Sequence, residues 1–155
     1  MNERNTSVEA DDFAVFLLPP RRPGAGVSAT LWILLGSALG GMARYAFSGF
    51  VARRIGEIFP WGTLLVNISG SFVIGLAAGE IAPGGALPGN LTVRELVMIG
   101  LCGGYTTFSS FSLQTLALAR GGDFFRAFGN IAASVLLCFL AAWAGYALGT
   151  LIPGG

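Results

Sequence analysis

One stretch of the chain carries most of the groups that could handle an ion. Residues 100–114 read GLCGGYTTFSSFSLQ and lie inside an apolar segment long enough to cross a bilayer. The stretch contains the pair Gly103 and Gly104, the pair Thr106 and Thr107, three serines, and two phenylalanines one helical turn apart. Irregular backbone at membrane depth is tolerated only where it is buried in protein or lines a wet cavity, because unpaired N–H and C=O groups are costly in hydrocarbon. The composition therefore indicates that something polar is held here.

Two interpretations fit this stretch equally well. In the first, the helix is broken, its freed carbonyl oxygens bind a cation, and its hydroxyls and ring edges line a pathway for a small ion. In the second, small residues make a close helix contact, and the hydroxyls bond back to their own helix.

Asn67 and Arg44 are strongly polar residues in other apolar segments, and each also has two interpretations. Asn67 lies one helical turn before Ser71, so both share a helix face. Its amide can bond a neighbouring helix or offer N–H donors to an anion. Arg44 is either an anchor at the membrane interface or a positive element that draws anions toward a vestibule.

Asn130 and Ser134 form a similar pair, one helical turn apart in the last apolar segment. They could extend a polar track that begins in the stretch 100–114, or they could hydrogen-bond one helix to another.

The composition is that of a polytopic membrane protein. Of the 155 residues, 54% are hydrophobic and 11% are charged, with a mean hydropathy of +0.71. Soluble domains carry about 25% charged residues. The net charge of +1 gives no basic face for nucleic acid. Histidine is absent, and the sequence holds neither a carboxylate pair inside a helix nor a nucleophile elbow, so we expect no enzyme.

These polar groups must be positioned by four apolar segments, which predict an all-α fold with a break in the third helix. The glycine pairs Gly36 and Gly40, Gly75 and Gly79, and Gly145 and Gly149 have the spacing that lets helices approach closely. The predicted spans cover residues 29–51, 63–81, 93–119 and 124–151.

The remaining segments are connections between or before these spans. Residues 1–28 are polar, acidic and proline-rich, and predict a disordered tail. A loop is expected to carry Arg53, Arg54 and Glu57, and Asp123 is expected to cap the fourth helix.

Arginines outside the spans are balanced between the two sides of the membrane. One side would hold Arg4, Arg21, Arg22 and Arg94, and the other Arg53, Arg54, Arg120 and Arg126. Such charges set the orientation of membrane proteins, so balance predicts insertion both ways round. Inverted copies could then pair, building an inverted repeat from one kind of chain.

Three motifs give the chain a specific resemblance. GGMARY at 40–45, GTLLVN at 62–67 and GGYTTFSSFS at 103–112 resemble the CrcB/Fluc family of fluoride channels over residues 29–151. The resemblance implies an antiparallel, dual-topology homodimer in the inner cell membrane, with two pores and a structural sodium ion at the dimer interface.

The resemblance also implies roles for particular residues. Backbone carbonyls of Gly103 and Thr106 would hold the sodium ion, and glycine at 103 would supply backbone freedom at the break. The implied fluoride pathway consists of the vestibule arginine Arg44, the pore asparagine Asn67, the phenyl rings of Phe108 and Phe111, and the polar groups of Thr107, Ser109, Ser110, Asn130 and Ser134.

One position departs from the family pattern, and one other class of function stays open. Members often carry a glutamate where this chain has Gln114, which keeps hydrogen bonding but not charge. The alternative function is a small dual-topology multidrug/proton antiporter. That class needs a carboxylate within the membrane, whereas Glu80 and Glu95 lie at span ends.

Overall fold

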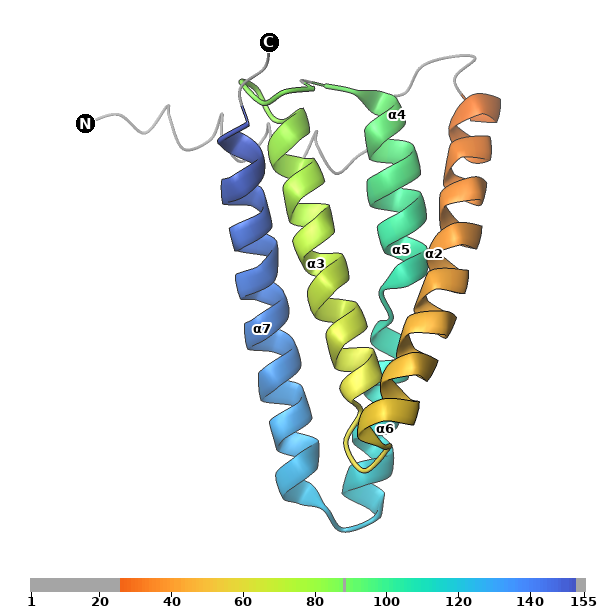
Figure 1. The fold of residues 1–155 in the computed structure, drawn as a ribbon, viewed down its shortest axis with the longest axis vertical. Helices are drawn as coiled ribbons and strands as arrows, with labels where there is room; N and C mark the ends of the chain where they lie inside the picture. Colours follow the sequence, from red (N-terminus) through yellow and green to blue (C-terminus); the bar gives the residue numbers. More distant parts are fainter. Residues whose placement is uncertain (1–25, 88, 153–155) are drawn as a thin grey trace, which may run out of the picture.

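The computed structural model describes residues 26–87 and 89–152. Within them the chain is all-helical, and its helices lie side by side (Figure 1). Four helical spans are long and apolar enough to cross a membrane: Val27–Ile55, Trp61–Ile81, Leu91–Arg120 and Phe124–Thr150. This confirms the predicted all-α, four-span membrane protein. The predicted tail lies outside the described residues up to residue 25, whereas residues 26–28 already belong to the first helix.

The first helix, α2 (Gly26–Ile55), is longer than predicted. Arg53 and Arg54 lie in its last turn and not in the expected loop. Cations are favourable there because the C-terminal end of a helix dipole is negative. The helix ends at Gly56, whose φ of +92° suits a residue without a side chain, and whose N–H donates to the Ala52 carbonyl at 2.9 Å.

Glycines bring the spans together, as their spacing predicted. On α3 (Trp61–Ile81), Gly75 and Gly79 face α7 (Phe124–Thr150), where Gly145 and Gly149 face α3 in return. A Cβ on Gly145 would lie 2.9 Å from the Leu76 nitrogen. Gly36 and Gly40 of α2 likewise lie against the backbone of the third span. Small residues therefore let the backbones touch.

This packing predicts a clear difference between two glycines on α7. Gly145→Ala should destabilise the protein by about 1–3 kcal/mol, because the added methyl group meets the α3 backbone, which cannot move aside. Gly129→Ala should not, since nothing lies within 4 Å of its added Cβ. Thermal unfolding in detergent compares the two. Equal midpoints for both variants would show that the α3–α7 contact is looser than described.

The third span consists of several helical pieces. It begins with α4 (Leu91–Val93), capped by Asn90, whose Oδ1 accepts from the Val93 N–H at 3.1 Å. It continues as a π-helix, η1 (Arg94–Cys102), and a short α5 (Gly103–Tyr105). Thr106 and Thr107 follow, and α6 (Phe108–Arg120) completes the span. The wider π-helical winding had no counterpart in the predictions.

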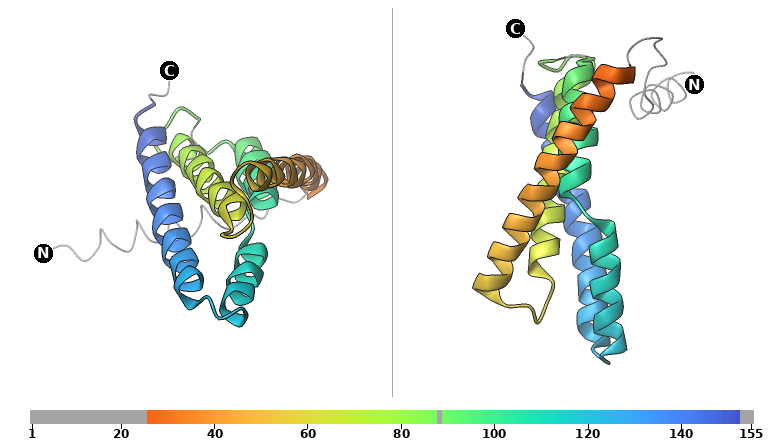
Figure 2. Two further views of the ribbon diagram at one scale, coloured as in Figure 1. Left: turned by 60° about the horizontal axis from the view of Figure 1, so that its bottom comes forward. Right: turned by 90° about the vertical axis from the view of Figure 1, so that its right-hand side faces the viewer.

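Asp123 caps the start of α7, as predicted. Asp123 Oδ1 accepts from the Arg126 N–H at 3.1 Å, and its Oδ2 pairs with Arg126 Nη1 at 2.7 Å. Figure 2 shows that the α2–α3 connection and the α6–α7 connection lie at the same end of the bundle but diverge from one another. A cleft at this end of the bundle is lined by residues of α2, α3 and α6 and of the two connections.

Candidate functional site

The site is centred on Thr106 and Thr107, which have extended backbone between α5 and α6. Thr106 has φ −75° and ψ 157°, and Thr107 has φ −150° and ψ 108°. The side chain of Asn67, on α3, pairs with the main chain of Thr107. The Thr107 N–H donates to Asn67 Oδ1 at 2.8 Å, and Asn67 Nδ2 donates to the Thr107 carbonyl at 3.2 Å. Asn67 therefore bonds a neighbouring helix, as one of its two interpretations required, and uses one amide hydrogen to do so.

This pairing changes the hydrogen bonds of the preceding turn. The Thr106 N–H and hydroxyl both donate to the Cys102 carbonyl at 2.9 Å. In an uninterrupted α-helix the next N–H, that of Thr107, would donate to the Gly103 carbonyl. Here it donates to Asn67 instead. The Gly103 carbonyl oxygen therefore loses its usual helical donor.

Gly103 itself is not conformationally special, which corrects the reason we expected glycine there. Its φ of −63° and ψ of −38° are ordinary helical values that any residue adopts. Nothing in the described chain lies within 4 Å of the position that a Cβ would take. Within the described residues, therefore, neither backbone conformation nor packing requires glycine at 103.

The hydroxyls of residues 107–115 are of two kinds: some cluster together, as a polar track requires, and others bond back to their own helix. Thr107 Oγ1 caps α6 by accepting from the Ser110 N–H at 3.1 Å, and lies 3.2 Å from Ser109 Oγ and 3.0 Å from Ser110 Oγ. These three hydroxyls form one cluster. Ser112 and Thr115 instead donate to carbonyls one turn back on their own helix, at 2.9 and 2.8 Å.

Phe108 and Phe111 lie beside the extended pair with their ring centroids 5.3 Å apart and their planes tilted by 49°. Phe108 is 79% exposed on the surface of the single chain. Both rings line a cleft of about 350 Å³, which we call the phenylalanine cleft. Its other lining residues include Asn67, Ser71, Gly103, Thr106, Thr107 and Ser134.

A second cleft adjoins this one, and a third cleft adjoins the second. The arginine cleft, of about 280 Å³, is lined by Arg44 with Ser48, Thr63, Thr107 and Ser110. Thr107 also lines the phenylalanine cleft. The arginine cleft shares Ser48, Thr63 and Ser110 with an outer cleft of about 660 Å³. Neighbouring hollows with shared wall residues therefore occupy the region from the diverging helix ends to the two phenyl rings.

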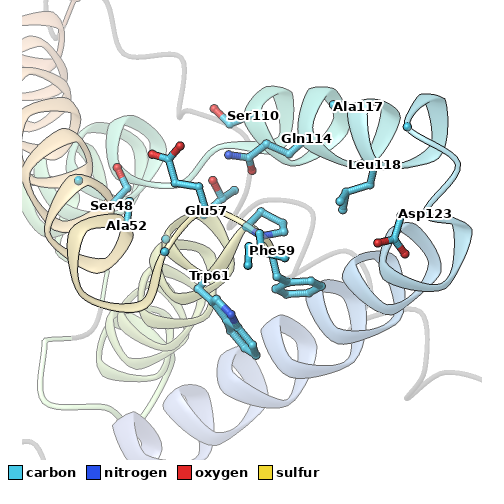
Figure 3. A pocket seen from close by; sticks show the side chains of 17 residues that line it. Ser48, Ala52, Glu57, Phe59, Trp61, Ser110, Gln114, Ala117, Leu118 and Asp123 are labelled. Atoms are coloured by element: carbon cyan, nitrogen blue, oxygen red, sulfur yellow. The ribbon is translucent and has the colours of Figure 1, made fainter.

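The outer cleft mixes acidic and neutral polar groups. Figure 3 shows Glu57, from the α2–α3 connection, and Gln114, from α6, extending into the same space from opposite walls. The Gln114 Oε1 atom is buried and has no hydrogen-bond partner within the described chain. Glu57 and Asp123 thus bring carboxylates to the outer cleft, whereas the side chain at position 114 is uncharged.

Two lining residues were missed by the sequence analysis, although their spacing contained a signal. Ser48 lies one helical turn after Arg44, and Thr63 lies one helical turn before Asn67. Each therefore shares a helix face with a residue that we had singled out.

Asn130 and Ser134 separate in the structure. Asn130 is 2% exposed, and its Nδ2 donates to Thr115 Oγ1 at 2.7 Å, which ties α7 to α6. It is not among the residues that line the phenylalanine cleft, whereas Ser134 is. For Asn130 the geometry favours the bond between helices, and for Ser134 it favours the polar track.

Comparisons with known proteins identify the family of this chain. Residues 31–146 match the family described as CrcB-like protein, Camphor Resistance (CrcB). A protein of Methylocella silvestris named "Fluoride-specific ion channel FluC" is 56% identical over 122 residues, covering 79% of this chain and 93% of the relative.

Other relatives carry the same name. Those of Opitutus terrae and Rhodospirillum rubrum are 54% and 49% identical, covering 77% and 81% of this chain and 91% and 97% of the relatives. The match spans the helices that form all three clefts. The chain therefore belongs to the CrcB family.

Proposed function

We propose that this protein is a fluoride channel of the inner cell membrane, which lowers cytoplasmic fluoride by passive, potential-driven efflux. The observation that carries the proposal is the identity of about half of all aligned residues to proteins named for fluoride-specific conduction, over nearly their whole length. The series of adjoining clefts supports it, because a channel needs a route for its ion.

The electrical driving force is sufficient for passive export. Hydrogen fluoride enters a cell as a neutral acid and dissociates inside. A membrane potential near 100 mV, inside negative, drives one anion outward with about 2.3 kcal/mol, which sustains roughly a fiftyfold gradient. Neither an enzymatic reaction nor a second transported ion is required.

The groups along the route suit a small, strongly hydrated anion. Arg44 would raise the local concentration of anions near the vestibule. Asn67 has one amide hydrogen beyond the hydrogen used on Thr107, and the hydroxyls of Ser110 and Ser134, which line the clefts, can also donate. The Thr107 hydroxyl donates to Ser110 Oγ, and Ser109, which lies against that hydroxyl, is not among the lining residues of the three clefts. Phe108 and Phe111 would present electropositive ring edges. Asn130 would act indirectly, by fixing α6 against α7.

We further propose that the working unit is an antiparallel homodimer with dual topology. The balance of arginines supports insertion both ways round. The open side of the phenylalanine cleft supports pairing, because a 79% exposed Phe108 cannot enclose an ion pathway within one chain. A second, inverted copy would cover it.

A structural sodium ion would lie where two such copies meet. Sodium is bound in membrane proteins by carbonyl oxygens of unwound helices. The residues fit this requirement, since the Gly103 carbonyl has lost its usual helical donor and Thr106 is extended. Gly103 also faces open space. Two chains would offer these carbonyls twice, and the ion would hold the two interrupted helices together.

The phenyl rings give the first mutational prediction for this pathway. Phe108→Ile combined with Phe111→Ile keeps apolar bulk but removes both ring edges. At about 1 kcal/mol for each edge, fluoride flux should fall roughly thirtyfold. Dimer recovery by size exclusion should stay near that of the unchanged protein. If fluoride flux and dimer recovery fell to the same extent in the double variant, both rings would serve packing and not conduction.

Reconstitution tests the function itself. Proteoliposomes loaded with potassium fluoride should release fluoride, followed with a fluoride electrode, once valinomycin clamps the potential. Proteoliposomes loaded with potassium chloride, followed with a chloride electrode, should release far less chloride. The release should need no proton gradient. Release that depends on a proton gradient, or transport of organic cations without fluoride, would instead favour the multidrug/proton antiporter.

A further inference from the structure

We infer that Asn67 is also a positioning residue, which sets the affinity of the sodium site by holding the Thr107 N–H away from the Gly103 carbonyl. The inference rests on the proposed sodium site. It adds a role for Asn67 that is distinct from donation to fluoride, and it links the anion route to the cation site through one side chain.

The geometry of the amide carries the first step. Asn67 Oδ1 accepts the Thr107 N–H at 2.8 Å, and Asn67 Nδ2 donates to the Thr107 carbonyl at 3.2 Å. Both main-chain groups of Thr107 are thereby satisfied in an extended conformation that no helical bond supports. Thr107 is only 7% exposed, so solvent cannot replace these partners fully.

The neighbouring contacts keep α3 in place for this pairing. Ser69 Oγ lies 3.0 Å from the hydroxyl of Tyr105, one residue before the extended pair. A Cβ on Gly70 would lie 3.1 Å from the Tyr105 ring, so α3 approaches the third span closely here. These contacts hold α3 against the residue that precedes the interruption, and so fix the position of Asn67 relative to Thr107.

Loss of the Asn67 acceptor has a direct consequence for Gly103. The Thr107 N–H would then be buried without a partner, unless the chain rewound and donated it to the Gly103 carbonyl. Rewinding would occupy the oxygen that is proposed to bind sodium. Sodium affinity should therefore follow the acceptor at position 67, while fluoride passage should follow the donor.

Substitutions at position 67 separate these two properties. Asn67→Asp keeps an oxygen acceptor and loses the amide donor, whereas Asn67→Leu has similar bulk and neither group. Ser71→Ala, one helical turn along α3 in the same cleft, is the matched control. Each full-length protein is placed in lipid nanodiscs in a sodium-free buffer that contains N-methylglucamine as the cation. Sodium is then titrated in, and its binding is followed by calorimetry and by the unfolding midpoint of the protein.

We expect at least tenfold weaker sodium binding in Asn67→Leu and an affinity within about threefold of the original in Ser71→Ala. Asn67→Asp should bind sodium at least as tightly as the original, because it keeps the acceptor and its added negative charge favours a cation in the same cleft. Amide hydrogen exchange at Thr107 should accelerate in Asn67→Leu but not in Asn67→Asp. Should Asn67→Leu not yield folded protein, Asn67→Ala takes its place. A folded variant without the acceptor that binds sodium normally would overturn the inference, as would an Asn67→Asp protein that binds as weakly as Asn67→Leu.

The unchanged protein serves as the reference for the proposed function. Absence of sodium binding to it would overturn both the sodium site and this inference. Fluoride efflux from the same preparation is measured separately, so failure of the cation site and failure of the channel assignment are told apart.

Discussion

Two arginines in the α3–α4 connection should abolish fluoride efflux. Ala86→Arg and Leu87→Arg place positive charge in a connection whose Leu87 side chain is 40% exposed. They bias a nearly balanced chain so that this connection stays cytoplasmic. All copies would then share one orientation, antiparallel pairs could not form, and no complete pathway would be enclosed. Efflux from cells or liposomes should fall to the level of membranes without the protein.

Two controls separate topology from damage. Glutamine at the same two positions alters size and polarity without adding charge, and should leave efflux unchanged. An oppositely biased chain, with Ile55→Arg and Ile58→Arg, adds charge near Arg53 and Arg54 at two exposed positions. Either biased chain alone should be inactive, and their coexpression should restore efflux. Functional dimers from one biased chain, with its tags accessible from one side only, would refute dual topology.

Asn67→Asp should reduce fluoride flux roughly a thousandfold while the dimer stays folded. The substitution removes the remaining amide hydrogen and puts a negative charge beside the route. Two like charges about 4 Å apart repel by about 4 kcal/mol at the effective dielectric constant of a protein surface. The Thr107 N–H keeps its acceptor, so the fold around the extended pair should persist.

The measurement pairs fluoride efflux with dimer recovery by size exclusion. Asn67→Ser keeps a hydroxyl donor without the charge, and its fluoride flux should lie between that of the original protein and that of Asn67→Asp. An Asn67→Asp protein that conducts as fast as the original would remove Asn67 from the anion route. A protein that loses flux only because the dimer dissociates would make its role purely structural.

Much of the fold could be predicted because local chemistry decides it. Apolar length defined the four spans, the i to i+4 glycine spacing identified the faces along which Gly75 and Gly145 pack, and Asp123 had the residue type and place of a helix cap. Each depends on residues a few positions apart. The end of α2 was placed too early because charged residues suggested a loop, whereas Arg53 and Arg54 are favourable in a last helical turn.

The site was less predictable because its decisive contacts join distant parts of the chain. The bond between Asn67 and Thr107 connects residues 40 positions apart, and its pairing of an amide with extended backbone leaves no periodic pattern. The π-helix Arg94–Cys102 differs from an α-helix in which residues its backbone hydrogen bonds join, and its apolar residues are equally common in α-helices, so the sequence gives no sign of it. The spacing of Ser48 and Thr63 put them on the same helix faces as Arg44 and Asn67, but only the placement of three helices around the same clefts shows that these faces line them.

The reversal potential of the purified protein in a planar bilayer tests the central claim most directly. With a tenfold fluoride gradient and equal chloride and pH on both sides, current should reverse near 60 mV, since 100 mV is worth about 2.3 kcal/mol per charge and a tenfold gradient about 1.4 kcal/mol. A tenfold chloride gradient at equal fluoride should leave the reversal potential near zero. Reversal that follows the chloride or proton gradient, or the absence of any fluoride current from folded dimer, would contradict a fluoride-selective channel.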